Sequence, residues 1–426
     1  MFSATSTDPA ALPYDPAEVV AAHGSPTWVY DAATIERRID EVADFDTVRY
    51  AQKANSNLAV LALMRRRGVK VDAVTAGELH RARLAGYTLG SDDVVYTADL
   101  FDDDAIDLIR QHGVPVNVGS PDMIDQLAGY GIDVPITLRI NPGFGHGHSQ
   151  KVNTGGDSSK HGIWHTQIPD CLAAAERHGL TVCGLHMHIG SGADFEHLAR
   201  VADAMIDAAR TFTQHADTLG VVSAGGGLPI PYRKDQPQRI DTARYFRVWD
   251  AARNTIAELA GRPIHLEVEP GRYLVAEAGS LVTRVRSVKS SGGNHFVLID
   301  AGFNDLVRPS FYGAYHHISI HPADGSAASA RETVDTVVAG PLCESCDVFT
   351  QEEGGFVTSR SLPRAEVGDV LVLHDAGAYG MAMSSNYNSR RLAAELLLRD
   401  GQTHVVRQRQ SFASLTQFES IPDGLG

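Results

Sequence analysis

The sequence predicts an α/β protein that consists of a (β/α)8 barrel followed by a second, mostly antiparallel β domain. From about residue 46 to 272, short β-branched apolar runs alternate with helical stretches, which is typical of parallel βα units. The alternation yields eight candidate strands, the number that closes a barrel of this type. After residue 275, strand-like segments follow one another with few helices between them. A doubly wound open sheet remains the structural alternative.

The expected barrel strands each end in small or polar residues. The stretches between them have the apolar spacing of amphipathic helices, and many end in glycine, which commonly follows a helix. The strands are VRYAQKAN (48–55), VKVDAVTA (69–76), DVVYTA (93–98), VPVNVGS (114–120), ITLRINPG (136–143), VCGLHMHIGS (182–191), VVSAGGG (221–227) and HLEVEPGR (265–272).

The second domain is expected to be built from strands, with loops at 320–332 and 350–360. We expect residues 31–275 to form the barrel, and residues 1–30 and 276–426 to form the β domain. The expected strands of the β domain are SLVTRVRSVKS, HFVLIDAGF, TVDTVVAGP, DVLVLHDAG and THVVRQRQ.

Composition narrows the function classes. The 426 residues carry a formal net charge of −15, which argues against nucleic-acid or anionic-membrane partners because these require a basic face. The first residues do not resemble a signal peptide, and no apolar run approaches the roughly 20 residues of a membrane helix. Four cysteines in a chain of this length are not a disulfide framework. We therefore expect a reduced, cytoplasmic protein.

Function in such a barrel is located at the carboxyl ends of the strands. Gly225, Gly226 and Gly227 follow the seventh strand and Arg272 follows the eighth, where barrels often bind phosphate. Lys53 at the end of the first strand then suggests a Schiff base to pyridoxal phosphate. The pyridine nitrogen of this cofactor needs a partner, and a carboxylate there keeps the ring protonated and makes it a strong electron sink. Glu269 can do so; Glu267 is the alternative, or a buried paired acid.

Ten motifs in order carry a resemblance to a known family. The chain resembles the pyridoxal-phosphate-dependent decarboxylases with an alanine-racemase-like fold, and within them the branch that acts on diaminopimelate. The resemblance covers about residues 25–415. The motifs are YAQKANSN, VDAVTAGELHRA, NPGFGHGHSQKVNTGG, SKHGIW, GLHMHIGSG, SAGGGLPIPY, EVEPGRYLVA, NDLVRPSFYGAYHHI, VVAGPLCESCDVF and DAGAYGMAMSSNYNSR.

The resemblance implies roles for individual residues. It implies that Lys53 holds the cofactor, that His188 stacks on its ring with Asp72 nearby, and that Glu269 pairs with the pyridine. Cys343 resembles the proton donor. The cofactor phosphate and ring would be contacted by Ser191, Gly225, Gly226, Gly227, Pro270, Gly271, Arg272 and Tyr379, and the substrate by Arg272, Arg308, Tyr312, Glu344 and Tyr379.

The resemblance also implies a reaction and an assembly. The reaction is removal of the carboxylate at the D centre of meso-2,6-diaminopimelate to give L-lysine and CO₂, the last step of lysine biosynthesis. The assembly is a homodimer with shared active sites. The charges of these side chains agree with this substrate: Arg308 can pair with its distal carboxylate, and Glu344 can pair with its distal ammonium. Tyr312 can instead be ordinary packing.

Several alternatives stay open. One alternative is a relative that decarboxylates carboxynorspermidine, arginine or ornithine, but the Cys343–Glu344 sequence together with Arg308 argues against it. A second is a racemase, which would not be expected to keep Glu269. A third is a non-catalytic cofactor carrier, which would typically lose the thiol. Cys343 and Cys346 have no partner pair at zinc spacing, so we expect no metal site there. Cys346 departs from the glycine usual in the family; it is either inert or forms a reversible oxidative pair with Cys343. His186 is expected to be structural. The segment 143–165, rich in Gly and His, matches no common metal site and is interpreted as a mobile lid.

Overall fold

The computed structural model describes residues 12–147, 153–233 and 239–425. The described chain divides into two compact units. One unit, the barrel unit, contains residues 34–231 and 239–275. The other, the β unit, contains residues 12–33, 232–233 and 276–425. The two units are described separately.

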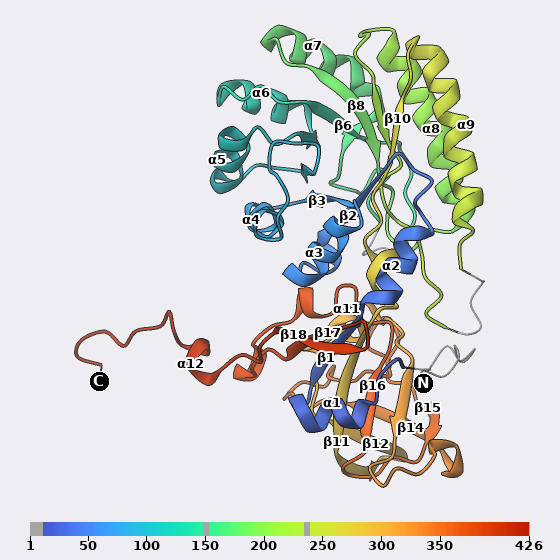
Figure 1. The fold of residues 1–426 in the computed structure, drawn as a ribbon, viewed down its shortest axis with the longest axis vertical. Coiled ribbons are helices and arrows are strands. Elements are labelled where there is room, and N and C mark those ends of the chain that lie inside the picture. Colours follow the sequence, from blue (N-terminus) through green and yellow to red (C-terminus); the bar gives the residue numbers. More distant parts are fainter. Residues whose placement is uncertain (1–11, 148–152, 234–238, 426) are drawn as a thin grey trace. The chain divides into compact units, whose positions relative to one another are not determined.

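The barrel unit is built around a ring of parallel strands. Its strand order is β5-β4-β3-β2-β10-β9-β8-β6, and β5 also pairs with β6, which closes the ring. The short strand β7 adds to the outer edge of β6. Closure excludes the open doubly wound sheet and confirms the predicted barrel. In Figure 1 the helices of this unit lie around the strands, with α8 and α9 side by side.

The barrel strands are short runs rich in apolar and β-branched side chains, and most of their residues are buried. Strands β3, β4 and β10 are buried along almost their whole length, as expected where helices cover a parallel sheet. Helices begin at polar caps: the side chains of Asn57, Thr75, Asp102 and Asp241 each accept a backbone N–H of the first turn.

The strands of the barrel unit are β2 (Thr47–Ala51), β3 (Lys70–Ala73), β4 (Val94–Ala98), β5 (Val116–Val118), β6 (Ile136–Asn141), β7 (Ile163–Trp164), β8 (Val182–Met187), β9 (Val221–Ser223) and β10 (His265–Val268). Its helices are α2 (Ala32–Asp40, which begins in the β unit), α3 (Leu58–Arg66), α4 (Ala76–Leu84), α5 (Asp103–His112), α6 (Pro121–Gly129), α7 (Ile168–His178), α8 (Phe195–Thr213), α9 (Thr242–Ala260) and α10 (Arg272–Val275).

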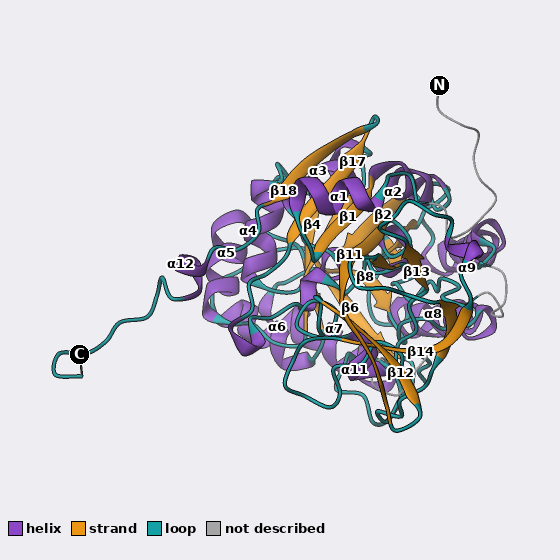
Figure 2. Ribbon diagram, turned by 90° about the horizontal axis from the view of Figure 1, so that it is seen from below, coloured by secondary structure: helices purple, strands orange, loops and turns teal. Residues whose placement is uncertain are grey.

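The β unit contains a mostly antiparallel sheet, as predicted. Strand β1 lies between β11, to which it is antiparallel, and β17, to which it is parallel. Strands β11, β12 and β14 run side by side along the sheet (Figure 2). Among the described residues, no helix combines the length and apolarity that crossing a membrane requires.

The strands of the β unit are β1 (Thr27–Asp31), β11 (Gly279–Ser291), β12 (Asn294–Ile299), β13 (Ile318–His321), β14 (Thr333–Ala339), β15 (Arg360–Pro363), β16 (Val370–Leu373), β17 (Ala394–Arg399) and β18 (Gln402–Arg407). Its helices are α1 (Pro16–His23), α11 (Arg308–Tyr312) and α12 (Phe412–Leu415).

Candidate active site

Lys53 and Asp72 lie together at the carboxyl ends of neighbouring barrel strands. Lys53 is in a single 3-10 turn (Gln52–Ala54) directly after β2, and its Nζ is 4.0 Å from the Asp72 Oδ2. Asp72 is buried, whereas 43% of the Lys53 side chain is exposed. Burial raises the pKa of Asp72, and the charge of Lys53 offsets this only in part. The Asp72 Oδ1 is buried and has no hydrogen-bond partner within the described residues.

Glu269, just after β10, is held by two hydrogen bonds. His186 Nε2 lies 2.7 Å from Glu269 Oε2, and the Ser223 hydroxyl donates to Glu269 Oε1 at 3.0 Å. Burial raises the pKa of Glu269, but the charge and hydrogen bond of His186, the Ser223 hydroxyl and Lys53 together lower it to about 2. Glu269 is therefore a carboxylate throughout the physiological pH range.

Glu267 lies two residues earlier and has a different partner. Arg49 donates to both of its carboxylate oxygens, from Nε at 2.7 Å and from Nη2 at 2.8 Å. This is a buried bidentate ion pair. Of the two interpretations left open for Glu267, the structure favours the buried paired acid.

His188 follows β8 and faces the same group. Its pKa is well below the usual value because burial disfavours the charged form and because Arg139 and Lys53 are also positive. The ring is therefore neutral. Its Nδ1 is buried and finds no hydrogen-bond partner in the part of the chain that the structure describes.

The glycine segment after β9 passes very close to neighbouring backbone. A Cβ on Gly225 would collide with the Met187 carbonyl oxygen, and one on Gly226 would lie 2.5 Å from the Glu269 carbonyl oxygen. A Cβ on Gly227 would lie 2.6 Å from the Gly190 carbonyl oxygen. Side chains are thus excluded here, which leaves backbone groups at the surface of the segment.

Ser191 and the segment after β10 complete the barrel group. Arg272 donates to the Ser191 hydroxyl from Nη2 at 2.9 Å and from Nε at 3.3 Å, although these residues are far apart in sequence. The Pro270 carbonyl accepts the N–H of Ala51 at 3.3 Å. A Cβ on Gly271 would lie 3.1 Å from the Ala51 carbonyl oxygen, so this segment packs against the strand that precedes Lys53.

Within the β unit, Arg308 is buried and oriented by aromatic side chains. The ring nitrogen Nε2 of His316 lies 2.9 Å from Arg308 Nη1, and His316 Nδ1 lies 2.9 Å from the His374 carbonyl oxygen. Because a carbonyl only accepts, His316 carries its proton on Nδ1 and accepts from Arg308 at Nε2. The Arg308 guanidinium also lies 5.0 Å from the centre of the Tyr232 ring.

Cys343 and Glu344 are in the exposed loop that follows β14. The Cys343 N–H donates to Asn388 Oδ1 at 3.2 Å, and the Tyr387 hydroxyl bonds the Glu344 carboxylate. The Asp347 carboxylate accepts the N–H groups of Leu342 and Phe303, each at 2.7 Å, and so shapes the loop. The thiols of Cys343 and Cys346 are both free and exposed. Cys346 is not among the described residues with positive φ, so its backbone does not require the glycine usual at this position.

Tyr379 has an unusual backbone conformation, whereas Tyr312 makes an ordinary ring contact. Tyr379 has a φ of 57°, a left-handed conformation that is rare for an aromatic residue and is typical of functional segments. Tyr312 packs edge-on against Phe311, with 4.7 Å between ring centres. That contact is compatible with ordinary packing.

The structure brings Lys53, Asp72, His188 and Glu269 into one group in the barrel unit. Sequence reasoning missed two members of the group: Ser223, which it did not consider, and His186, which it treated only as structural. His186 lies on the same strand face as His188, two residues earlier, and that spacing was the available signal. The predicted lid at 143–165 lies partly outside the described residues, which omit 148–152.

Comparisons with known proteins show the family of this chain. Residues 32–276 match the family model described as pyridoxal-dependent decarboxylase, pyridoxal binding domain. The chain is 53% identical to diaminopimelate decarboxylase of Escherichia coli strain K12, covering 94% of this chain and 95% of that protein. It is 52% identical to diaminopimelate decarboxylase of Streptomyces coelicolor, covering 95% and 92%.

Solved structures give the same result. A crystal structure of diaminopimelate decarboxylase has 53% identity and a TM-score of 0.91, covering 95% of both chains. That of diaminopimelate decarboxylase from Helicobacter pylori, complexed with L-lysine, has 28% identity and a TM-score of 0.85, covering 95% of this chain and 99% of that one. The chain therefore belongs to the pyridoxal-dependent decarboxylases, and within them to the diaminopimelate decarboxylases.

Proposed function

We propose that this chain removes the carboxylate at the D centre of meso-2,6-diaminopimelate, releasing CO₂ and L-lysine, the last step of lysine biosynthesis. The observation that carries the proposal is Glu269, a buried carboxylate after β10 that His186 and Ser223 hold ionised, beside the neighbouring strand β2, whose end carries Lys53. Identity of 53% to relatives of the same name along almost the whole chain supports the substrate.

The residues present fit pyridoxal phosphate. The cofactor needs an amine for its aldehyde carbon, a carboxylate for its pyridine nitrogen and backbone donors for its phosphate. Lys53, Glu269 and the glycine segment at 225–227 supply these. Beside them, the buried atoms Asp72 Oδ1 and His188 Nδ1 have no hydrogen-bond partner among the residues that the structure describes. When bound, pyridoxal phosphate supplies an electron sink for the pair released as CO₂ leaves.

The chain's own groups prepare that chemistry. Lys53 would hold the cofactor through its aldehyde carbon. Glu269 would bind the pyridine nitrogen and favour its protonated form. The neutral His188 would lie against the cofactor without adding positive charge, and Asp72 lies beside Lys53.

The phosphate is assigned to the segment after β9 and to the Ser191–Arg272 pair. Backbone N–H groups of Gly225, Gly226 and Gly227 can approach an anion closely because no Cβ intervenes. Arg272 adds positive charge and already bonds the Ser191 hydroxyl. Pro270 and Gly271 hold this segment against the end of β2.

In this proposal, the β unit binds the distal end of the substrate and supplies a proton. Arg308, held in orientation by His316, binds the distal carboxylate, and Glu344 binds the distal ammonium. Tyr312 and Tyr379 contact substrate and cofactor. The Cys343 thiol would supply the proton that replaces the lost carboxylate.

We assign the working form to a cytoplasmic homodimer, in which Cys343 and Glu344 of one copy serve the barrel of the other. Two free, exposed thiols suit a reducing compartment. The exposed position of the loop that carries Cys343 and Glu344 suits a contact with a second chain.

The test is L-lysine and CO₂ release from meso-diaminopimelate by the purified protein with added pyridoxal phosphate. Wild type is expected to form both products in equal amounts. Lys53→Ala is expected to form neither and to lose the visible absorbance of lysine-bound cofactor. Ornithine, arginine and lysine are expected to be poor substrates.

A matched control is Lys70→Ala. Lys70 begins β3 at the opposite end of the barrel strands and pairs with Asp92, so its loss should leave turnover unchanged. Faster release of CO₂ from ornithine or arginine than from diaminopimelate would contradict the assigned substrate. Equal turnover by Lys53→Ala and wild type would contradict the assigned lysine.

A further inference from the structure

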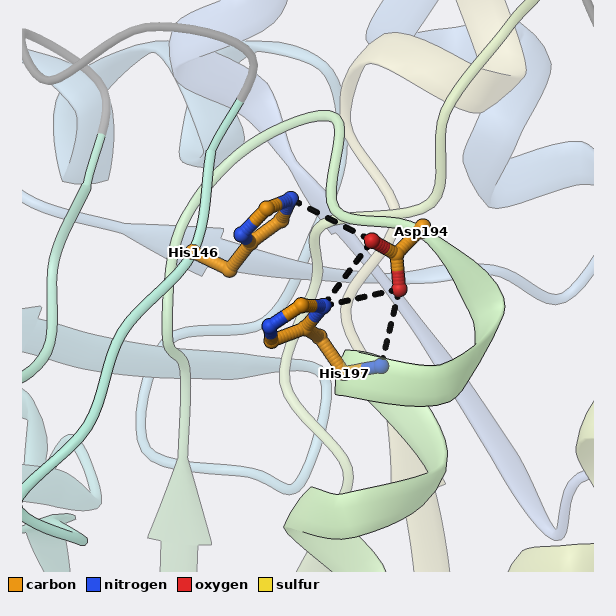
Figure 3. Close-up of side chains that lie close together, drawn as sticks. All are labelled: His146, Asp194 and His197. Carbon is orange, nitrogen blue, oxygen red and sulfur yellow. Dashed lines mark hydrogen bonds and ion pairs between the residues drawn. The ribbon is translucent and has the colours of Figure 1, made fainter.

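Three potential metal ligands converge at the carboxyl end of the barrel strands, apart from the group around Lys53. They are His146 from the segment after β6, Asp194, and His197 in the first turn of α8. One ligand atom from each residue lies within 4.8 Å of the others. Figure 3 shows both imidazole rings directed at the Asp194 carboxylate.

The three side chains are positioned by backbone contacts. Asp194 is the N-cap of α8, and its Oδ1 accepts the His197 N–H at 2.9 Å. His146, 48 residues earlier in sequence, is held by its own N–H, which donates to the Ile189 carbonyl at 3.1 Å. His197 Nδ1 lies 2.8 Å from Oδ1 and 2.9 Å from Oδ2, and His146 Nε2 lies 3.4 Å from Oδ2, so Oδ2 is the oxygen near both rings.

A structural explanation accounts for part of this arrangement. An Asp cap with a histidine three residues later is a local pair, and two imidazoles can simply stack, here at 3.8 Å between centres. A simple His–Asp pair occurs elsewhere in the chain: His178 Nε2 lies 2.8 Å from Asp125 Oδ1, at similar exposure. The cluster at Asp194 differs because a second imidazole, from a distant segment, points a nitrogen at the same oxygen.

We propose that His146, Asp194 and His197 form a Zn²⁺ site. Two imidazole nitrogens and one carboxylate oxygen, with water in the fourth position, are a ligand set that Zn²⁺ commonly takes, whereas Mg²⁺ and Ca²⁺ prefer oxygen alone. With bonds of about 2.0–2.1 Å, tetrahedral ligand atoms lie roughly 3.3 Å apart. The 3.4 Å between His146 Nε2 and Asp194 Oδ2 meets this spacing. The His197 Nδ1 to Asp194 Oδ2 distance of 2.9 Å must widen, and the two rings, which stack at 10° to each other, must turn so that both nitrogens face the ion.

The ion would connect two segments that adjoin the proposed cofactor site. Asp194 lies three residues after Ser191, whose hydroxyl accepts from Arg272. The Ile189 carbonyl that anchors His146 also accepts the N–H of Thr154 at 3.1 Å. Zn²⁺ would therefore fix the chain between β8 and α8 against the segment after β6. The metal site does not depend on the identity of the amino-acid substrate.

The experiment is a Zn²⁺ titration of the purified holoenzyme against a chromophoric chelator, with Co²⁺ absorption as a second readout. Wild type should take up one tightly held ion per chain. His146→Gln and His197→Gln should each weaken binding at least tenfold. Asp194→Ser keeps an oxygen for the helix cap and should weaken binding equally without loss of the bound-cofactor absorbance.

The control is His178→Gln, which removes the His–Asp pair between α7 and α6 and should leave Zn²⁺ affinity unchanged. The Co²⁺ form of wild type should lack the intense near-ultraviolet band of thiolate ligation, which separates this site from Cys343 and Cys346. Unchanged affinity in His146→Gln and His197→Gln, or a thiolate band in wild-type protein, would overturn the proposal. Because the titration does not use diaminopimelate, its result is independent of the decarboxylation assay.

Discussion

Two acidic residues at one strand end, Glu269 and Glu267, have opposite partners and so different expected roles. Glu269 bonds His186 and Ser223, and Glu267 bonds Arg49. Glu269→Gln removes the negative charge that would keep the cofactor nitrogen protonated. We expect kcat to fall roughly 100-fold or more, measured as L-lysine formation at saturating cofactor and substrate.

Glu267→Gln is the matched variant, because Glu267 is equally buried. It breaks a buried ion pair and leaves Arg49 without its full complement of acceptors. We expect a loss of about 3 kcal/mol or more in stability, with turnover per folded enzyme unchanged. Equal loss of turnover in both variants would contradict the separate roles.

Glu78, in the first turn of α4, makes stability depend on pH. Burial, and next the charge of Asp72, raise its pKa to about 7, although the Val74 N–H, at 2.8 Å, lowers it. A carboxyl with a higher pKa in the folded than in the unfolded chain destabilises the fold when it ionises. Its penalty therefore grows as pH rises from about 4.5 to 7.

Glu78→Gln should remove that penalty while keeping an acceptor for the Val74 N–H. The variant should match wild type near pH 4.5 and exceed it by about 1–3 kcal/mol at pH 8, measured by urea unfolding at both values. Glu258→Gln, an exposed glutamate on α9, is the control. A stability difference of the same size at both pH values would rule out this ionisation as the cause.

At the residue scale, the sequence predicted which side chains meet at the strand ends better than it predicted the bonds between them. Lys53 and Glu269 were expected to lie near each other because a barrel gathers its strand ends, which is a property of topology. The bond between His186 and Glu269 depends on the register across β8, β9 and β10, and the register is set by packing of the whole ring.

At the element scale, all eight barrel strands were predicted, and the structure ends most of them earlier at the carboxyl side. The segment 221–227, for example, is a strand only to Ser223. The residues beyond it leave the ladder and form the loops of the site. In the β unit, β1, β13, β15 and β17 were missed. The short strands at 318–321 and 360–363 are strands mainly because they pair with neighbouring strands, and the sequence pattern alone does not reveal that pairing.

The glycine segment after β9 supports a prediction about close backbone approach. Gly225→Ala places a methyl group against the Met187 carbonyl at a φ of 61°. We expect it to cost about 3 kcal/mol or more, since something must shift, and to weaken retention of pyridoxal phosphate on dialysis.

Gly261→Ala separates steric crowding from backbone strain. Gly261 follows α9 with a φ of 66°, and nothing lies within 4 Å of an added Cβ. It should cost only about 1 kcal/mol and leave cofactor retention unchanged. If both variants lost the cofactor to the same extent, backbone strain at positive φ, and not steric crowding, would explain the effect of Gly225→Ala.

At the scale of the whole molecule, the proposed shared active site predicts complementation. Lys53→Ala and Cys343→Ala should each be nearly inactive alone. After mixing and subunit exchange, half of the dimers are mixed, and one of their two sites has both residues intact, so about a quarter of wild-type turnover should return. The assay is lysine formation, with light scattering to verify dimers.

The control for this experiment mixes Lys53→Ala with the double variant Lys53→Ala/Cys343→Ala, which cannot assemble an intact site. It should recover nothing. No recovery in the first mixture, although mass spectrometry detects mixed dimers, would place Lys53 and Cys343 of each site in one chain.

The position of β1 imposes an order on synthesis. This strand leaves the ribosome before every barrel strand, yet its parallel partner β17 begins about 360 residues later, roughly 20–70 s at usual elongation rates. All barrel strands emerge within that interval. The nascent chain must therefore keep an apolar strand from pairing elsewhere while the barrel forms, which makes β1 the segment where a ribosome-bound chaperone would be most useful.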